Sequence, residues 1–352
     1  MIDHNPIIGF RVDATSKIGA GHAMRCLSIA RSLSARGSKA IFFVSCDESA
    51  AFFKSENYEC RILPADETCL TVRDARNLGT ALKECGASCL LIDSYGVDGG
   101  FFDAVENGSL AEIHIAYIDD MYSYAQGIIK LPLKRPVDIL INCDIIANED
   151  QYRFAYHDCN TQLMLGPLYA PLREEFSTQR KEPLKKSVTD ILVTTGSTNP
   201  SNLLERLSNL CLESCQDAII HVVVGPKAKF KQMESSRVVL HEGDSISDLM
   251  RRCQMAVSSA GVTLLELAAL GIPTVAVSIV ENQRQVAQAF EDMELGLSCC
   301  ATDERQSIIS SINRLFIDAN LRDSFSSKCM KMVDGKGADR IAAALLDLAN
   351  DR

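Results

Sequence analysis

The segment Gly19-Ala20-Gly21-His22 places a histidine directly after two glycines, where an apolar run gives way to a helical pattern. The run Ile7–Val12 predicts a buried strand, and the apolar spacing over His22–Arg36 predicts a helix. Glycines let backbone N–H groups approach a phosphate or sugar, and the positive end of a helix dipole favours a neutral imidazole. His22 is therefore a candidate general base, the alternative being a histidine that only caps or packs at the turn.

The same glycines partly match the dinucleotide-binding fingerprint G-x-G-x-x-G. The third glycine of that pattern would fall at position 24, which is Met24. The sequence therefore does not favour NAD binding, and we expect no cofactor. The cysteines and histidines lack the spacing of zinc ligands, so we predict no metal either.

Two further loops join a predicted strand to a predicted helix in the second half of the chain. The first, Ile191–Asn202, ends a buried strand in small polar residues that include Gly196 and Ser197, with Asn202 opening the helix. The second, Ser258–Thr263, leads into a helix whose N-terminus can hold a diphosphate, and Glu266 one turn later can accept hydrogen bonds from ribose hydroxyls. Ordinary helix capping and a surface helix-dipole partner are the alternatives.

Short polar motifs also follow other predicted strands, in Asp93-Ser94-Tyr95, Asp119-Asp120 and Asn282-Gln283. Parallel strands bring their carboxyl ends to one edge of a sheet, so these groups are expected at ligand-binding edges. Paired acids could bind a metal, but they more often hold loops or sugar hydroxyls. No P-loop, Ser-His-Asp order or H-E-x-x-H motif stands out.

Short apolar runs alternate with helical segments along the whole chain, which indicates an α/β fold with parallel sheets. We predict two Rossmann-like, doubly wound domains facing a cleft, over residues 1–176 and 188–352, with a charged linker at 177–187. The predicted strands are Ile7–Val12, Ala40–Ser45, Cys89–Asp93, Ile113–Ile118, Asp138–Asn142, Asp190–Thr195, Ala218–Gly225, Arg237–His241, Met255–Ser258 and Thr274–Ile279. The predicted helices are His22–Arg36, Asn202–Ser214, Ser245–Arg252, Val262–Leu270, Glu281–Met293, Asp303–Asp318 and Ala338–Ala349.

The overall composition excludes several classes of protein. The 352 residues carry a net charge of −10 and no Lys/Arg-rich stripe, so nucleic acid is not an expected partner. No apolar run reaches the ~18 residues of a membrane span, and the first residues lack the features of a secretory signal. We therefore expect a cytoplasmic protein whose partner is a small molecule. The oligomeric state is not specified, and a monomer is compatible with the sequence.

Taken together, these motifs resemble the UDP-2,4-diacetamido-2,4,6-trideoxy-β-L-altropyranose hydrolases of pseudaminic acid biosynthesis. That family is related to UDP-sugar glycosyltransferases with the GT-B fold. The segments that carry the resemblance, in family order, are Gly19–Leu27, Asp93–Tyr95, Gly166–Phe176, Ile191–Leu203, Ser259–Asn282 and Asp334–Ile341. The pairing of GAGHAMRC with GPLYAPLREEF is the most specific of these signals.

The resemblance implies metal-independent cleavage of the anomeric C–O bond, releasing UDP and a free sugar destined for flagellin or cell-surface glycans. It implies that His22 activates water, that Tyr95 lies near the sugar, and that Glu266 holds the ribose. The diphosphate would lie on Ser259–Thr263. The full set of implied binding residues is Gly19, Gly21, Arg25, Gly196, Ser197, Asn202, Ser259, Ala260, Gly261, Val262, Thr263, Glu266, Asn282 and Gln283.

The sequence departs from the family pattern in both loops of the expected nucleotide site. The usual Gly-Gly-Ser/Thr-Asp turn reads Thr195–Asn199 here, and the usual Gly-Ala-Gly-Gly-Ser-Thr loop reads Ser258–Thr263. We therefore keep the reaction class and leave the sugar and the nucleotide open. Two rival functions remain, a glycosyltransferase with a UDP-sugar donor and a nucleotide-sugar-binding protein without turnover.

Overall fold

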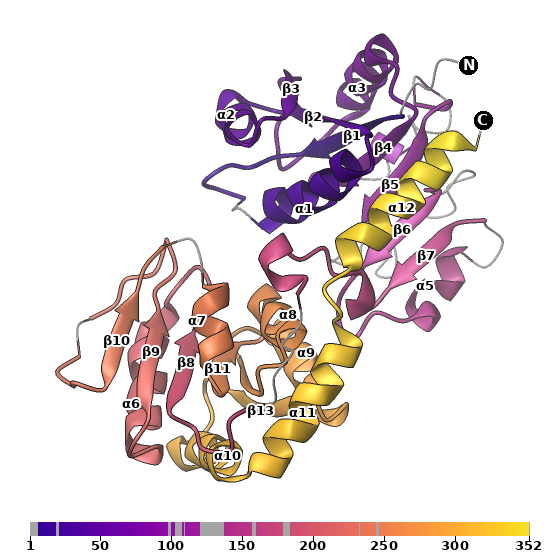
Figure 1. Ribbon diagram of the computed structural model, residues 1–352. Coiled ribbons are helices and arrows are strands. Elements are labelled where there is room, and N and C mark those ends of the chain that lie inside the picture. The colour runs from indigo at the N-terminus through magenta and orange to yellow at the C-terminus, as the bar shows by residue number, and fades with distance from the viewer. Residues whose placement is uncertain are drawn as a thin grey trace. The chain divides into compact units, whose positions relative to one another are not determined.

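The computed structural model describes residues 6–18, 21–97, 100–102, 108, 110–119, 137–156, 160–178, 184–231, 233–243 and 246–351, with the side chains of 153–156 and 282 left out (Figure 1). The chain forms two compact units. The first comprises Met1–Arg173 with Lys336–Arg352, and the second comprises Glu174–Gly335.

The first unit is built on a parallel sheet in which the described strands follow the order β3-β2-β1-β4-β5-β6-β7. The strands are β1 (Ile7–Val12), β2 (Lys39–Val44), β3 (Glu59–Ile62), β4 (Cys89–Asp93), β5 (His114–Ile118), β6 (Ile139–Asn142) and β7 (Gln162–Leu165). The central strands read as nearly continuous apolar runs because both of their faces are covered, as is usual for a parallel sheet.

Helices cover both faces of this sheet. They are α1 (Gly21–Ala35), α2 (Asp47–Ser55), α3 (Val72–Cys85), α5 (Glu149–Tyr156) and α12 (Gly337–Asn350). One buried cluster joins α1 and α12 to Ile8 and Phe10 of β1, and a second joins α3 to Leu90 and Ile92 of β4. The chain leaves α1 at Gly37, whose positive φ of 84° is typical of a glycine that ends a helix.

The C-terminal helix α12 belongs to the first unit, whereas the sequence-based division placed it in the second. It packs beside α1 (Figure 1). The Ser32 hydroxyl also donates a 2.5 Å hydrogen bond to Asp339 Oδ1. Gly337 lies directly on the backbone of residue 170, where any side-chain carbon would come within 2.2 Å of the Ala170 carbonyl oxygen. The apolar spacing of this segment predicts a helix, but it carries no information about which sheet the helix covers.

The second unit contains another parallel sheet, in the order β10-β9-β8-β11-β12-β13. Its strands are β8 (Asp190–Thr194), β9 (Ile219–Val223), β10 (Val238–His241), β11 (Met255–Ser259), β12 (Thr274–Ser278) and β13 (Gly296–Cys300). Its helices are α6 (Leu203–Ser214), α7 (Ser247–Arg252), α8 (Val262–Ala269), α9 (Glu281–Asp292), α10 (Arg305–Ile317) and α11 (Ala319–Met332).

The two sheets share one winding order, which confirms the predicted α/β fold class with two Rossmann-like units. In each, the first strand lies centrally, the next two extend to one side, and the following strands extend to the other. The order therefore reverses between β1 and β4, and again between β8 and β11. Open sheets of this kind bind ligands at the carboxyl ends of the strands where the order reverses.

Candidate active site

His22 lies in the first turn of α1, beside the reversal point of the first sheet. Its Nδ1 is 2.5 Å from Oδ1 of Asp93, and both side chains are buried. Asp93 ends β4 and pairs in register with Val12 at the end of β1, so the fold brings together two residues far apart in the sequence. Sequence analysis singled out both residues, but it did not predict that they touch.

Asp93 is also held by Arg25, one helical turn after His22. Arg25 donates through Nε to Oδ2 at 2.6 Å and through Nη2 to Oδ1 at 2.5 Å. Burial alone raises the pKa of Asp93, but the charge and hydrogen bonds of Arg25, with those of His22, outweigh it and hold the pKa well below its ordinary value. Asp93 is therefore an ionised carboxylate that can only accept hydrogen bonds. Arg25, which the resemblance implied as a binding residue, therefore contacts a carboxylate of the protein itself.

The ionised Asp93 fixes the tautomer of His22. Nδ1 lies 2.5 Å from the carboxylate, and Nη2 of Arg25 is more distant, at 3.0 Å. Because Asp93 can only accept, we assign the proton of a neutral His22 ring to Nδ1. Nε2 then carries the lone pair, as a general base requires.

Cys26 also contacts Asp93, with Sγ 3.4 Å from Oδ2. Burial, followed by the charge of Asp93, raises the pKa of the Cys26 thiol well above its ordinary value. The thiol is therefore a protonated donor to Asp93 and not a reactive thiolate.

Tyr95 lies in the loop after β4, and its side chain contacts His22. Its ring meets the His22 ring edge-on, with centroids 4.4 Å apart, while more than half of the tyrosine remains exposed. An exposed aromatic ring next to a buried base can offer an apolar surface to a ligand.

A pocket of about 80 Å³ opens beside His22 and Asp93. A single water needs only about 10–15 Å³, so the pocket has room for water together with part of a ligand. The other residues that line it are Asp13, Ile18, Glu67, Thr68, Ser94 and Tyr95. All of them belong to the first unit.

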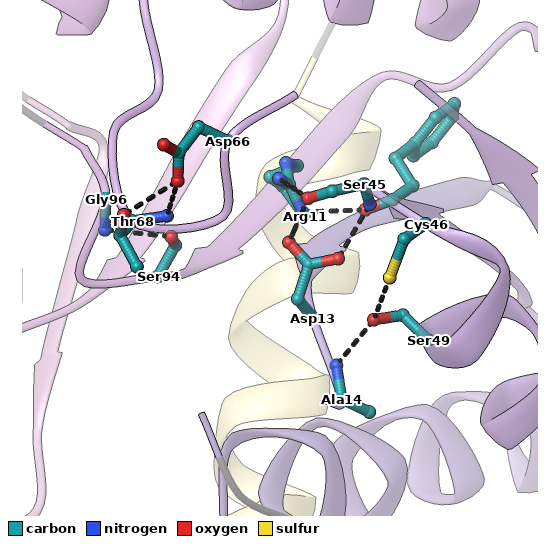
Figure 2. Close-up of polar contacts among 11 residues, drawn as sticks. Arg11, Asp13, Ala14, Ser45, Cys46, Ser49, Asp66, Thr68, Ser94 and Gly96 are labelled. Carbon is teal, nitrogen blue, oxygen red and sulfur yellow. Dashed lines mark hydrogen bonds and ion pairs between the residues drawn. The ribbon is translucent and has the colours of Figure 1, made fainter. Parts of the chain in front are cut away.

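One wall of the pocket is a buried network at the end of β1 (Figure 2). Arg11 donates to Oδ2 of Asp13 at 2.7 Å and to Oγ of Ser45 at 2.8 Å, and Ser45 donates to Asp13 through both its backbone N–H and its hydroxyl. Burial alone raises the pKa of Asp13, but Arg11 and the Ser45 hydrogen bonds lower it below its ordinary value. Sequence analysis missed this pair, although an arginine inside the apolar run Ile7–Val12 was a signal for it.

The opposite wall is the turn Asp66–Cys69, which lies against the loop after β4. Gly96 makes this contact possible, because a side-chain carbon there would lie 2.7 Å from the carbonyl oxygen of Glu67. Gly96 also accepts a 2.7 Å hydrogen bond from Leu70 N–H, and its own N–H donates to Ser94 Oγ (Figure 2). No sequence motif marked this turn.

The second sheet presents small residues at its own reversal point, between β8 and β11. Gly196 has a φ of 78° and lies near the hydroxyl of Ser259, which is buried at the end of β11. Gly225 packs on the same turn, since a side-chain carbon there would come within 2.1 Å of the Gly196 carbonyl oxygen. The backbone at Gly196 and Ser197 is thereby fixed beside Ser259.

Helix α8 begins at this edge without a side-chain cap. Gly261 is its N-cap residue and makes no capping hydrogen bond through a side chain, while Val262 is 66% exposed. Gly261 also lies close to Gln283, whose Oε1 accepts a 3.0 Å hydrogen bond from Ile279 N–H. The amides of the α8 N-terminus form an edge suited to an anion, and Glu266 lies half-buried in the next turn of the helix.

The structure gives less information about the surroundings of the other predicted site residues. Ala260 is buried between β11 and β12, and Thr263 is half-buried in α8. Asn202 adopts a left-handed conformation before α6 and makes no side-chain cap. Gly19, Asp120 and the Asn282 side chain lie outside the described residues.

Two further searches cover only the described part of the chain. Within it, no group of three or more His, Cys, Asp or Glu side chains is arranged to hold a metal ion. No helix in that part combines the length and the apolar character needed to span a membrane.

The winding of both sheets defines a GT-B-like fold, and solved structures agree. The glycotransferase of kitacinnamycin superposes with a TM-score of 0.67 at 14% identity, covering 98% of this chain and 100% of its own. The calicheamicin glycosyltransferase CalG4 gives 0.65 at 14% identity, with 99% of each chain covered. Arabidopsis thaliana UGT89C1 complexed with UDP gives 0.65 at 11% identity, covering 97% of this chain and 100% of its own. At these identities the likeness shows the fold alone.

Sequence relatives give more particular names. The chain is 24% identical to the spore coat polysaccharide biosynthesis protein SpsG of Bacillus subtilis, over 97% of this chain and 98% of SpsG. It is 25% identical to the Campylobacter jejuni UDP-2,4-diacetamido-2,4,6-trideoxy-β-L-altropyranose hydrolase, over 79% of this chain and 93% of that enzyme. An uncharacterized protein of Methanocaldococcus jannaschii is 25% identical over 79% of this chain and 57% of its own length. No known protein-family profile matches. The sequence comparison therefore confirms that this chain is similar to the hydrolase that its motifs resemble.

Proposed function

We propose that this protein hydrolyses a UDP-linked diacetamido-trideoxy-hexose to UDP and free sugar, with water attacking the anomeric carbon. The observation that carries the proposal is the buried pair of His22 and Asp93 beside a pocket of about 80 Å³. A general base needs a ring nitrogen with an available lone pair, and the hydrogen bond of Nδ1 to ionised Asp93 leaves Nε2 as that nitrogen in a neutral His22 ring. The relative named as hydrolase of UDP-2,4-diacetamido-2,4,6-trideoxy-β-L-altropyranose supports this choice of substrate.

The proposed mechanism combines general-base catalysis with stabilisation of the leaving group. Nε2 of His22 takes a proton from water, which then attacks the anomeric carbon of the sugar. The α8 N-terminus at Gly261–Thr263 stabilises the charge that develops on the departing diphosphate, and Glu266 binds the ribose hydroxyls. UDP is already a good leaving group, so positioning and charge stabilisation are the main requirements.

The deciding experiment follows UDP release from UDP-2,4-diacetamido-2,4,6-trideoxy-β-L-altrose in ¹⁸O-labelled water. Attack at the anomeric carbon places the label in the free sugar, and attack at phosphorus would place it in UDP. His22→Ala should lower turnover at least about 10²-fold while UDP still binds. The matched control is His114→Gln, because His114 begins β5 and so lies at the opposite, amino end of the strands.

Two outcomes would contradict the proposal. Near-normal turnover by folded His22→Ala would remove the general base from the mechanism. If the wild-type protein releases no UDP in water alone but releases UDP when an added acceptor receives the sugar, the result favours the glycosyltransferase alternative, which the fold of the solved relatives also allows.

A further inference from the structure

Glu67 differs from the other carboxylates of the pocket in its partners. Asp13 and Asp93 are each bound by an arginine and by further hydrogen bonds. The Glu67 side chain is only 15% exposed, and its one ionic neighbour among the described residues is Lys17, whose Nζ is 3.7 Å from Oε1. That separation exceeds hydrogen-bond range, and Lys17 itself is largely exposed. Among the residues that the structure describes, none donates a hydrogen bond to this carboxylate, so it can accept one from a ligand in the pocket.

The turn that carries Glu67 is held in place. Asp66 accepts hydrogen bonds from both the N–H and the hydroxyl of Thr68, at 2.9 and 2.7 Å (Figure 2). The close contact between Gly96 and the Glu67 carbonyl oxygen fixes the backbone at the next position. Glu67 is thus presented to the pocket from a backbone with little freedom to move.

The charges around the pocket decide which part of a nucleotide sugar suits it. Arg11 is bound to Asp13 and Arg25 is bound to Asp93, so the charge of Glu67 remains the least neutralised. A diphosphate offers negative charge and acceptors, which such a surface repels. The sugar offers O–H and N–H donors, which it attracts.

We propose that Glu67 is a specificity-determining residue, whose carboxylate accepts a hydrogen bond from a hydroxyl or acylamino N–H of the sugar. This inference rests on the proposed function insofar as it takes a UDP-sugar as the ligand. It goes beyond that function because it assigns recognition of the sugar to a turn between β3 and α3 that carries no catalytic group. A sugar that lacks a donor at the position facing Glu67 loses this contact.

The test measures how much the sugar adds to the binding of UDP. The dissociation constants of UDP and of UDP-2,4-diacetamido-2,4,6-trideoxy-β-L-altrose are determined by calorimetry in a His22→Ala background, where turnover is suppressed. The dissociation constant of UDP divided by that of the UDP-sugar isolates the contribution of the sugar to binding. Glu67→Gln replaces a charged acceptor by a neutral group of the same shape and should lower the ratio about tenfold, with UDP binding unchanged. Glu56→Gln, which alters an exposed ion pair with Arg31, is the matched control and should leave the ratio unchanged.

The possible results separate this inference from the proposed function. A ratio of one in the parent, or a ratio that Glu67→Gln leaves unchanged, overturns the assignment of Glu67. An equal loss of affinity for UDP and for the UDP-sugar also overturns it, because that result indicates a general structural role. If the ratio falls as expected but wild-type protein releases no UDP in water, hydrolysis is refuted and the role of Glu67 stands.

Discussion

Replacing Asp93 by Asn tests the reasoning about the active site most directly. The carboxylate is buried and receives hydrogen bonds from His22, Arg25 and Cys26 at 2.5–3.4 Å. Asn has nearly the same shape but no charge, so Arg25 loses its ion pair with residue 93. Removing one member of a buried ion pair typically costs about 3–5 kcal/mol, and we expect a loss of about 3 kcal/mol because the Asn oxygen still accepts one hydrogen bond.

The same substitution should impair catalysis through the tautomer of His22. An Asn amide can donate to Nδ1, which moves the ring proton to Nε2 and removes the lone pair that faces water. We expect turnover to fall about 10²–10⁴-fold, with little change in UDP affinity. Asp138→Asn is the matched control, since Asp138 precedes β6 at the amino end of the strands. Turnover is followed as UDP release, and unfolding by urea titration.

A double-mutant cycle makes the stability argument refutable. Arg25→Met removes the other member of the pair, so the double variant Arg25→Met/Asp93→Asn leaves no unpaired charge. We expect it to be less destabilised than the sum of the single variants, by about 1–3 kcal/mol. Additive effects, or an Asp93→Asn protein as stable and as active as wild type, would refute the account of this pair.

Three further predictions concern other parts of the chain. Glu266→Ala should weaken UDP binding about 10- to 100-fold in calorimetry, because two hydrogen bonds to ribose are lost, and unchanged affinity would exclude that role. Cys26 should react with a thiol reagent at least ~10-fold more slowly than exposed Cys69 in native protein, as mass spectrometry of the labelled peptides can show, and equal rates would contradict its raised pKa. Asp13 and Asp93 have lowered pKa values in the folded state, so they stabilise it above the unfolded pKa of about 3.9 and lose this effect as the pH falls from there toward their lower folded-state pKa values. The urea midpoint should therefore decline in that range, less steeply in Asp93→Asn, and an identical decline in both proteins would count against the assignment.

The sequence predicted most strands of the fold because parallel strands are buried on both faces, but it predicted no helix at α2, α3, α5 or α11. Each predicted strand is present, with ends that differ by a residue or two. The strands that were missed are β3, β7 and β13, which are short and lie at or near the edges of their sheets. The β3 segment Glu-Cys-Arg-Ile mixes charged and apolar residues because neither of its faces is fully covered, so it has no apolar run to detect.

The sequence predicted individual residues of the candidate site, but it did not predict which of them contact each other. Sequence analysis identified His22 and Asp93 from local motifs, but their contact depends on β4 lying next to β1, which follows from the winding order of the sheet. Glu67 enters the pocket from a turn that no motif marks. Its position depends on the close approach that Gly96 allows, and this is visible only in three dimensions.

The return of α12 to the first unit has a consequence for how the protein is made. During synthesis, residues 174–335 form an uninterrupted stretch, so the second unit can complete its core as soon as that stretch has emerged. The first unit cannot do so, because Ile341, Ala342 and Leu345 of α12 complete the buried cluster that surrounds α1. The helix that carries His22 therefore acquires its final packing only after α12 has followed the second unit out of the ribosome, and chains that terminate before α12 would lack that packing around His22.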